Sequence, residues 1–213
     1  MIVSFSGIDS AGKTTQIDKL IAYLDANNVN YIKKWSKARG TPGIEFVKSL
    51  IRRDVGLDER AKAEVRKNIY QNKMKQKLLY IASLFDLCWY WGVYYRVLNI
   101  THKYLICDRY LWDTYVELKH DFYNIDIDNS MLWKLVKSLA PVPDVSFVFL
   151  VPAELSLQRD IMKDASDIEE INIKKSKIDL YHILVDSNMW TNVMDGTLSR
   201  EMLHSMILEI MNI

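Results

Sequence analysis

Cysteine, histidine, proline and glycine are all scarce in this sequence of 213 residues, which has two, four, four and seven of them respectively. Cys88 and Cys107 lie in apolar stretches, with no CxxC spacing and no histidine at metal-ligand spacing. This pattern argues against a disulfide framework and a zinc site, and it favours reduced thiols in the core of a cytoplasmic protein. No Pro/Gly/Ser-rich linker divides the chain, so we expect a single domain, residues 1–213.

The sequence also lacks an excess of charge of either sign, because 28 basic residues are balanced by 27 acidic ones. The net charge of +1 argues against bulk electrostatic attraction to nucleic acid or to acidic membranes. Any anionic ligand must then be held by a local site, which favours a small-molecule partner.

Long apolar runs free of charge are missing as well. The most membrane-like stretch, residues 78–100, carries Ser83, Asp86, Gly92 and Arg96 in its interior. Charges in the middle of a lone membrane span are costly, and the aromatic residues are not gathered at the ends, so we expect a buried or dimer-facing helix and no membrane span. The N-terminal MIVSFSG has no basic leader, which predicts a buried strand in place of a signal peptide.

Short apolar runs alternate with helix-length segments along the chain. The runs predicted as strands are Ile2–Ser6, Tyr31–Lys34, Tyr104–Cys107, Val145–Val151 and Met189–Met194. This alternation predicts the α/β class, with a parallel sheet covered by helices on both faces. A helix is predicted after Lys13, with a stop at Asn27 and Asn28, and a last helix is predicted to begin near Ser199.

The strongest motif is residues 7–14, Gly-Ile-Asp-Ser-Ala-Gly-Lys-Thr, which fit G-x-x-x-x-G-K-[ST] between a predicted strand and a predicted helix. The glycines let backbone N–H groups and a helix N-terminus point at phosphate oxygens. In such a P-loop, Lys13 supplies charge to the β- and γ-phosphates of ATP and Thr14 ligates Mg²⁺. The residues predicted to bind ATP are Gly7, Ser10, Ala11, Gly12, Lys13, Thr14 and Thr15.

A second candidate site follows the third predicted strand, where Asp108, Arg109 and Tyr110 stand together. A carboxylate after a buried strand is suited to completing the Mg²⁺ shell, although an aspartate there is also a common turn or cap residue. The guanidinium of Arg109 is suited to clamping the transferring phosphate oxygens.

With GIDSAGKTTQ, CDRY and the RGTP stretch at this spacing, the sequence resembles the thymidylate kinases, P-loop nucleoside monophosphate kinases, from residue 2 to about 211. The resemblance implies the three-layer P-loop NTPase fold, with a five-stranded parallel sheet flanked by helices and a mobile lid, here residues 152–176. It also implies a homodimer formed through long helices such as residues 78–100.

Carried over by position, the resemblance makes Asp9 a contact of the acceptor sugar, Arg39 a ligand of the acceptor phosphate and Tyr80 a ring that stacks on the base. It assigns Arg109 and Tyr110 to the same substrate. The alternatives from the residues alone are a turn for Asp9, a solvated charge for Arg39 and core packing for Tyr80.

The sequence departs from the family where the base is read and in the lid. Ser83 and Leu84 replace the usual pair that ends in an arginine. Asp113 and Glu117 stand where an acceptor for an exocyclic amine would be placed, or they face solvent. In the lid, Arg159 and Lys163 match an R-x-x-x-R spacing and are the predicted catalytic cations with Lys13 and Arg109, joined by Lys174 or Lys175.

The predicted function is transfer of the ATP γ-phosphate, with Mg²⁺, to dTMP or a related pyrimidine nucleotide. Two alternatives remain open at this level. One is a kinase for a nucleoside or a modified nucleotide, and the other is a nucleotide-binding regulatory protein with weak transfer activity.

Overall fold

The computed structural model describes residues 1–35, 73–163 and 168–213, and the chain divides into two compact units. The first unit contains residues 1–35, 98–116, 142–163 and 168–213, and the second unit contains residues 73–97 and 117–141. Two helices, α5 (Tyr95–Thr101) and α6 (Leu111–Asp121), begin in one unit and end in the other.

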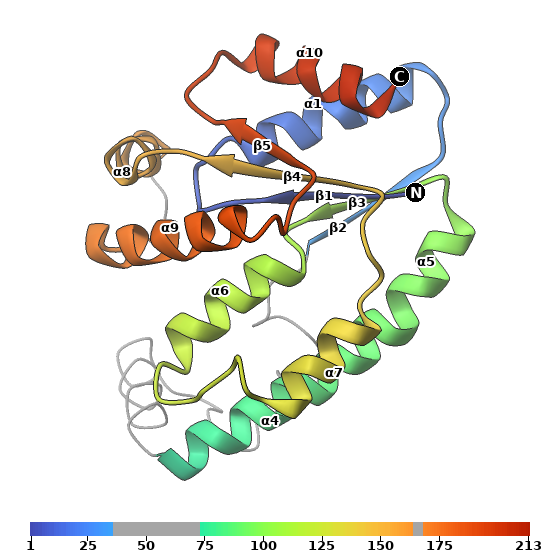
Figure 1. The fold of residues 1–213 in the computed structure, drawn as a ribbon. Helices are drawn as coiled ribbons and strands as arrows, with labels where there is room; N and C mark the ends of the chain where they lie inside the picture. The colour runs from blue at the N-terminus through green and yellow to red at the C-terminus, as the bar shows by residue number, and fades with distance from the viewer. Residues whose placement is uncertain (36–72, 164–167) are drawn as a thin grey trace, which may run out of the picture. The chain divides into compact units, whose positions relative to one another are not determined.

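The first unit is built on a sheet of five parallel strands in the order β2-β3-β1-β4-β5 (Figure 1). The strands are β1 (Ile2–Ser6), β2 (Tyr31–Trp35), β3 (Tyr104–Asp108), β4 (Val145–Leu150) and β5 (Asn192–Asp195). Every residue of β1 and β3 is buried, as expected for central strands of a sheet covered on both faces. The predicted P-loop NTPase-type α/β fold is confirmed.

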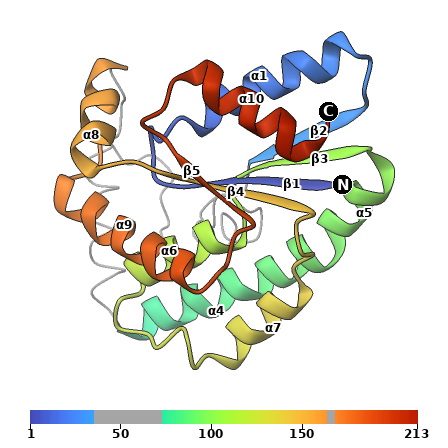
Figure 2. The same cartoon turned by 45° about the horizontal axis from the view of Figure 1, so that its top comes forward.

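Helices cover both faces of this sheet. In both views α1 (Lys13–Ala26) and α10 (Arg200–Met211) lie together on one face, and α9 (Ile171–Asp186) lies on the other (Figures 1 and 2). Helix α1 packs through Ile17, Leu20 and Leu24, which recur at helical spacing and are at most 1% exposed. The predicted start and stop of this helix are confirmed, since Asn27 is its C-cap.

The fifth strand begins three residues later than predicted. The backbone N–H of Met189 donates to the carbonyl of Leu184 at 3.1 Å, so this residue still closes α9. Thr191 then bonds through its N–H and hydroxyl to Ser146, before the regular ladder starts at Asn192. The predicted segment Met189–Met194 therefore mixes the end of a helix with the strand.

The parallel order brings the functional segments to one edge of the sheet. Strand β1 lies between β3 and β4. The chain that leaves β1 goes on to β2 at one end of the sheet, whereas the chain that leaves the neighbouring β4 goes on to β5 at the other end. Such a switch point is where open α/β sheets bind ligands. The P-loop follows β1, Asp108 ends β3, α8 (Ala153–Met162) follows β4 and Gly196 follows β5.

The second unit consists of helices. Helix α4 (Lys73–Trp89) runs into a π-helical turn, η1 (Tyr90–Tyr94), and then into α5. Helix α7 (Met131–Leu139) begins at the N-cap Ser130, whose hydroxyl accepts from the N–H of Trp133 at 3.3 Å, and it packs on α4. Residues 78–100 are thus helical, and within the described ranges we find no helix with the length and apolar character to span a bilayer.

Candidate active site

The P-loop is shaped by two glycines with positive φ. Gly7 has φ +133° and Gly12 has φ +101°, a region of backbone conformation that favours glycine. At Gly7 the space is closed too, because a Cβ atom there would lie 2.5 Å from the carbonyl oxygen of Phe149. Gly12 is the N-cap of α1, so the loop ends on a helix N-terminus, the arrangement that attracts phosphate.

Lys13 is buried beneath the loop. Its Nζ donates to the carbonyl oxygens of Gly7 at 2.8 Å and of Ile8 at 2.6 Å. Burial of the ammonium, followed by the nearby positive charge of Arg109, lowers the pKa of Lys13 from 10.5 to about 8, against the opposing effect of Asp9. Two backbone carbonyls thus hold the ammonium at the P-loop.

Arg109 is fixed as firmly as Lys13. Its backbone is left-handed, with φ +73°, and its N–H donates to the carbonyl of Phe5 at 2.9 Å. The guanidinium is buried, donates to the carbonyl of Gly7 at 3.2 Å and forms an ion pair with Asp9. A preorganised guanidinium of this kind is suited to clamp phosphate oxygens.

Asp108 lies beside these two cations at the carboxyl end of β3. Burial raises the pKa of the Asp108 carboxyl, while Lys13 and Arg109 oppose the rise. Asp108, Lys13, Thr14 and Arg109 all line one pocket of about 100 Å³, together with the rest of residues 9–15, Trp35 and Lys163.

The donor set of this pocket fits Mg²⁺. Thr14 exposes its side chain on the first turn of α1, and Asp108 offers a carboxylate in the same pocket. Mg²⁺ is commonly bound by one or two protein oxygens, with water and phosphate completing its shell. Among the described residues no group of three or more His, Cys, Asp or Glu side chains forms a metal cluster, so a self-contained cage is not built there.

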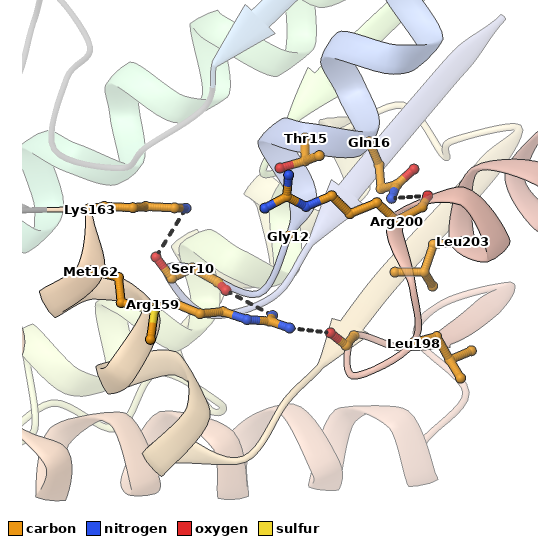
Figure 3. A pocket seen from close by; sticks show the side chains of 11 residues that line it. Ser10, Gly12, Thr15, Gln16, Arg159, Met162, Lys163, Leu198, Arg200 and Leu203 are labelled. Carbon is orange, nitrogen blue, oxygen red and sulfur yellow. Dashed lines mark hydrogen bonds between the residues drawn. The ribbon is translucent and has the colours of Figure 1, made fainter.

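A larger pocket of about 330 Å³ adjoins the P-loop (Figure 3). Arg159 of α8 donates to the carbonyl oxygens of Ser10 at 3.3 Å and of Gly196 at 3.1 Å, and Lys163 donates to the hydroxyl of Ser10 at 3.4 Å. The structure thereby brings both predicted lid cations to the P-loop. The other lining residues are Gly12, Thr15, Gln16, Met162, Leu198, Arg200 and Leu203.

The expected contribution of Lys174 to the free positive charge of the lid is wrong. Lys174 is fully buried, and its Nζ donates to the carboxylate of Asp160 at 2.6 Å and to the hydroxyl of Ser156 at 3.0 Å. Ser156 in turn donates to the carbonyl of Asp9 at 2.8 Å. Lys174 therefore supports the P-loop through Ser156, and its positive charge is paired with the carboxylate of Asp160. Lys175 is exposed and pairs with Glu154 at 2.8 Å.

The two acidic candidates on α6 are buried and do not face solvent. The carboxylate of Asp113 accepts hydrogen bonds from Ser6 at the end of β1, Gly7 of the P-loop, the N–H of Tyr110 and Tyr181 of α9, which corrects its expected role as an acceptor for a base amine. Glu117, in the second unit, is 5% exposed. The solvent-facing alternative is thus wrong for both residues.

The predicted substrate residues are only partly brought together. Asp9, Arg109 and Tyr110 lie in the first unit at the P-loop, whereas Arg39 lies outside the described residues. Tyr80 belongs to the second unit, is 4% exposed and packs edge-on against Phe122, with ring centroids 5.4 Å apart. This agrees with the core-packing alternative for its ring.

Several site residues have no signal in the sequence. Gln16 and Arg200 line the larger pocket, where the Gln16 amide donates to the Arg200 carbonyl at 3.0 Å. Gln16 is predictable only as part of the helix after the P-loop. Arg200 and Gly196 are separated from the P-loop by most of the chain, so only the folded structure shows that they lie near it.

The comparisons with known proteins agree with this geometry. A family model described as thymidylate kinase matches residues 5–207. A thymidylate kinase of Fervidobacterium nodosum is 25% identical, over 100% of this chain and 98% of its own, and one of Sulfurihydrogenibium sp. is 25% identical, over 97% and 94%. One of Ehrlichia chaffeensis is 28% identical over 75% of this chain and 70% of its own. The chain belongs to the thymidylate kinase family.

Proposed function

We propose that this protein is a nucleoside monophosphate kinase that transfers the γ-phosphate of ATP to dTMP or a closely related pyrimidine nucleotide. The observation that carries the proposal is the pocket in which Lys13, Asp108 and Arg109 meet the P-loop backbone. Two fixed cations and a carboxylate around a pocket of this size suit a transferring phosphate group. Family membership supports the same reaction.

On the donor side, we assign the ATP phosphates to the P-loop residues Gly7, Ser10, Ala11, Gly12, Lys13, Thr14 and Thr15. The larger pocket is suited to the nucleoside part of ATP, because apolar Met162, Leu198 and Leu203 line it together with side chains that can donate hydrogen bonds. Thr14 and Asp108 would hold Mg²⁺, which when bound neutralises the charge on phosphate oxygens. Arg159 and Lys163 extend from α8 toward the same phosphates.

On the acceptor side, Asp9 and Arg39 are assigned to the sugar and the phosphate of the monophosphate, and Arg109 and Tyr110 to its reacting end. Tyr80 is assigned to the base, which requires its ring to become accessible. An acceptor phosphate oxygen attacks the γ-phosphorus as the bond to the ADP oxygen breaks, so no covalent enzyme intermediate is needed. The residues contribute positioning and positive charge.

A panel of acceptors with ATP and Mg²⁺ tests this proposal. We expect ADP release to depend on an added nucleoside monophosphate and to be absent with the matching nucleosides, because Arg39 has no phosphate to hold in a nucleoside. Equal rates with thymidine and dTMP would indicate a nucleoside kinase. If no added acceptor changes the rate of ADP release, the protein binds ATP and hydrolyses it slowly, as expected for a nucleotide-binding regulatory protein.

Recognition of the base should be less strict than an arginine would make it. Leu84 is buried and apolar, and the hydroxyl of Ser83 is used in a bond to the carbonyl of Leu79 at 2.8 Å. A lost donor to thymine O4 costs roughly 1–3 kcal/mol, or about 5- to 150-fold in affinity. We therefore expect kcat/KM for dTMP to exceed that for dUMP, dCMP or a 5-substituted dCMP by less than about 100-fold. A larger preference over all three would show that another donor replaces the arginine.

The rate should also depend on the ionisation of Lys13. Its ammonium form is present below the pKa of about 8 and is lost above it. We therefore expect kcat/KM for ATP, which reports the free enzyme, to fall as the pH rises through about 8. The decline of kcat should begin at higher pH, because bound phosphate favours the charged form. Steady-state rates across this range check the expectation, and a flat kcat/KM profile would contradict it.

We propose further that the protein is a cytoplasmic homodimer. Support for the dimer comes from an apolar stripe along α4, η1 and the start of α5, at spacings of four or seven residues. Its exposed members are Met74, Leu78, Phe85, Trp89, Val93 and Val97. Support for the location comes from Cys88 and Cys107, which form no disulfide. Light scattering checks the oligomeric state, for which we expect twice the chain mass.

A further inference from the structure

We infer that Asp113 is a positioning residue, whose buried carboxylate fixes the P-loop and the backbone around Arg109 against helix α9. The inference rests on the function proposed for this site and goes beyond it, because Asp113 contacts neither phosphate group nor base in that scheme. It also gives α9, which begins within the expected lid, a direct connection to the phosphate-binding loop.

The carboxylate of Asp113 accepts four hydrogen bonds. Its Oδ1 accepts from the N–H of Gly7 at 3.0 Å and from the hydroxyl of Tyr181 at 2.6 Å. Its Oδ2 accepts from the hydroxyl of Ser6 at 2.6 Å and from the N–H of Tyr110 at 2.9 Å. An ionised carboxylate has about four acceptor positions, so the residue is saturated. With 1% of its surface exposed, it has no access to a substrate group.

The four donors lie where the site is formed. Gly7 is itself a position of positive φ, at +133°, and Tyr110 directly follows another, Arg109, at +73°. A left-handed conformation costs about 1–2 kcal/mol for a residue other than glycine, so it persists only where the surroundings hold it. The bond from Tyr110 to Asp113 is one such restraint, and the bond from Arg109 to Phe5 is another.

Asp113 influences the position of Arg109 in two ways, through Gly7 and by direct approach. The guanidinium of Arg109 donates to the carbonyl of Gly7, and its Nη1 lies 3.7 Å from Oδ1 of Asp113. Asp113 therefore holds the N–H side of Gly7 while Arg109 holds its carbonyl side. A shift of Gly7 would move the guanidinium that is assigned to the transferring phosphate. Displacements of this kind impair the transition state more than ground-state binding.

The variant Asp113→Asn separates this role from simple packing. Whichever way the asparagine amide is oriented, its NH₂ group faces one backbone N–H, that of Gly7 or that of Tyr110. The hydroxyls of Ser6 and Tyr181 can rotate to accept a hydrogen bond, but a backbone N–H cannot. One restraint on the P-loop or on the Arg109 segment is therefore lost with almost no change of volume.

The test combines amide hydrogen exchange with steady-state kinetics. In Asp113→Asn, we expect the amide of Gly7 or Tyr110 to exchange at least about 10-fold faster, with no change at Gly196, whose N–H bonds to Leu150 at 2.9 Å. We expect kcat to fall about 100-fold and KM for ATP to change less than about 3-fold. Tyr181→Phe removes one of the four donors and should lower kcat about 5-fold. Asp179→Asn, an exposed carboxylate on α9, is the matched control and should behave as the wild type.

Each outcome decides one question. A kcat in Asp113→Asn within about 3-fold of wild type, or a lower kcat with unchanged exchange at Gly7 and Tyr110, would overturn the inference. If Asp113→Asn does not fold, Tyr181→Phe decides, and unchanged exchange and kcat in that variant would overturn it. A wild-type protein without monophosphate-dependent transfer would refute the proposed function alone, because the exchange measurement needs no activity.

Discussion

Replacing Lys13 with alanine should lower kcat for phosphoryl transfer by about 1,000-fold while the fold remains intact. The ammonium is held at the P-loop by its bonds to the carbonyls of Gly7 and Ile8, which use two of its three N–H groups. Its charge opposes the negative charge that develops on the γ-phosphate oxygens. Burial makes this interaction stronger than it would be in water.

The measurement is ADP release under saturating ATP, with thermal unfolding as the control for folding. Lys19→Ala is the matched control, since Lys19 lies on the same helix and its ion pair with Glu201, at 3.4 Å, is partly exposed. Such surface pairs contribute about 1 kcal/mol or less, so this variant should retain full turnover. Turnover in Lys13→Ala within about 10-fold of the wild type would refute the assignment of Lys13.

The second large effect is expected at Asp108. Asp108→Asn keeps the shape of the side chain but removes the negative charge, so kcat should fall about 100-fold and half-saturation should need more Mg²⁺. The neighbouring cations Lys13 and Arg109 would then lack the carboxylate that partly balances them. Initial rates across a Mg²⁺ titration measure both quantities.

Asp18→Asn supplies the comparison for Asp108, because Asp18 is exposed on α1 and pairs with Lys33 at 3.0 Å. This variant should show the wild-type rate and the wild-type Mg²⁺ dependence. If Asp108→Asn shows the same, the aspartate at the end of β3 is a turn residue and the metal site lies elsewhere.

The parts of the fold that local patterns determine were predictable. The apolar run that ends at the glycine motif predicts strand β1 with its observed bounds, Ile2–Ser6. Helix α1 followed from the spacing of its apolar residues and from Asn27 and Asn28. The π-helical turn at Tyr90–Tyr94 has no comparable signal, since its sequence continues the helical pattern on both sides. The single-domain organisation stays a prediction, and residues 36–72 and 164–167 lie outside the described chain.

The site residues also divide into those that the local sequence predicts and those that it does not. The P-loop and Asp108 were predictable because each is a short segment placed at a strand end. From its sequence position after the Arg109 motif, Asp113 is expected either to accept from a base amine or to face solvent, and it does neither. Its actual partners come from residues 6, 7, 110 and 181, and only the folded chain brings the last of these to α6. The sequence likewise gives no sign that Lys174 pairs with Asp160, since the two residues lie on different helices.

The central claim is that this site moves the γ-phosphate of ATP onto a nucleoside monophosphate. It is tested most directly by incubating the protein with dTMP, Mg²⁺ and ATP labelled with ¹⁸O in the γ-phosphate, and then measuring the products by mass spectrometry. The account predicts dTDP that carries the label in its terminal phosphate, in amounts equal to the ADP formed. Label recovered only in inorganic phosphate, with no labelled nucleoside diphosphate from dTMP or from the related pyrimidine monophosphates, would contradict it.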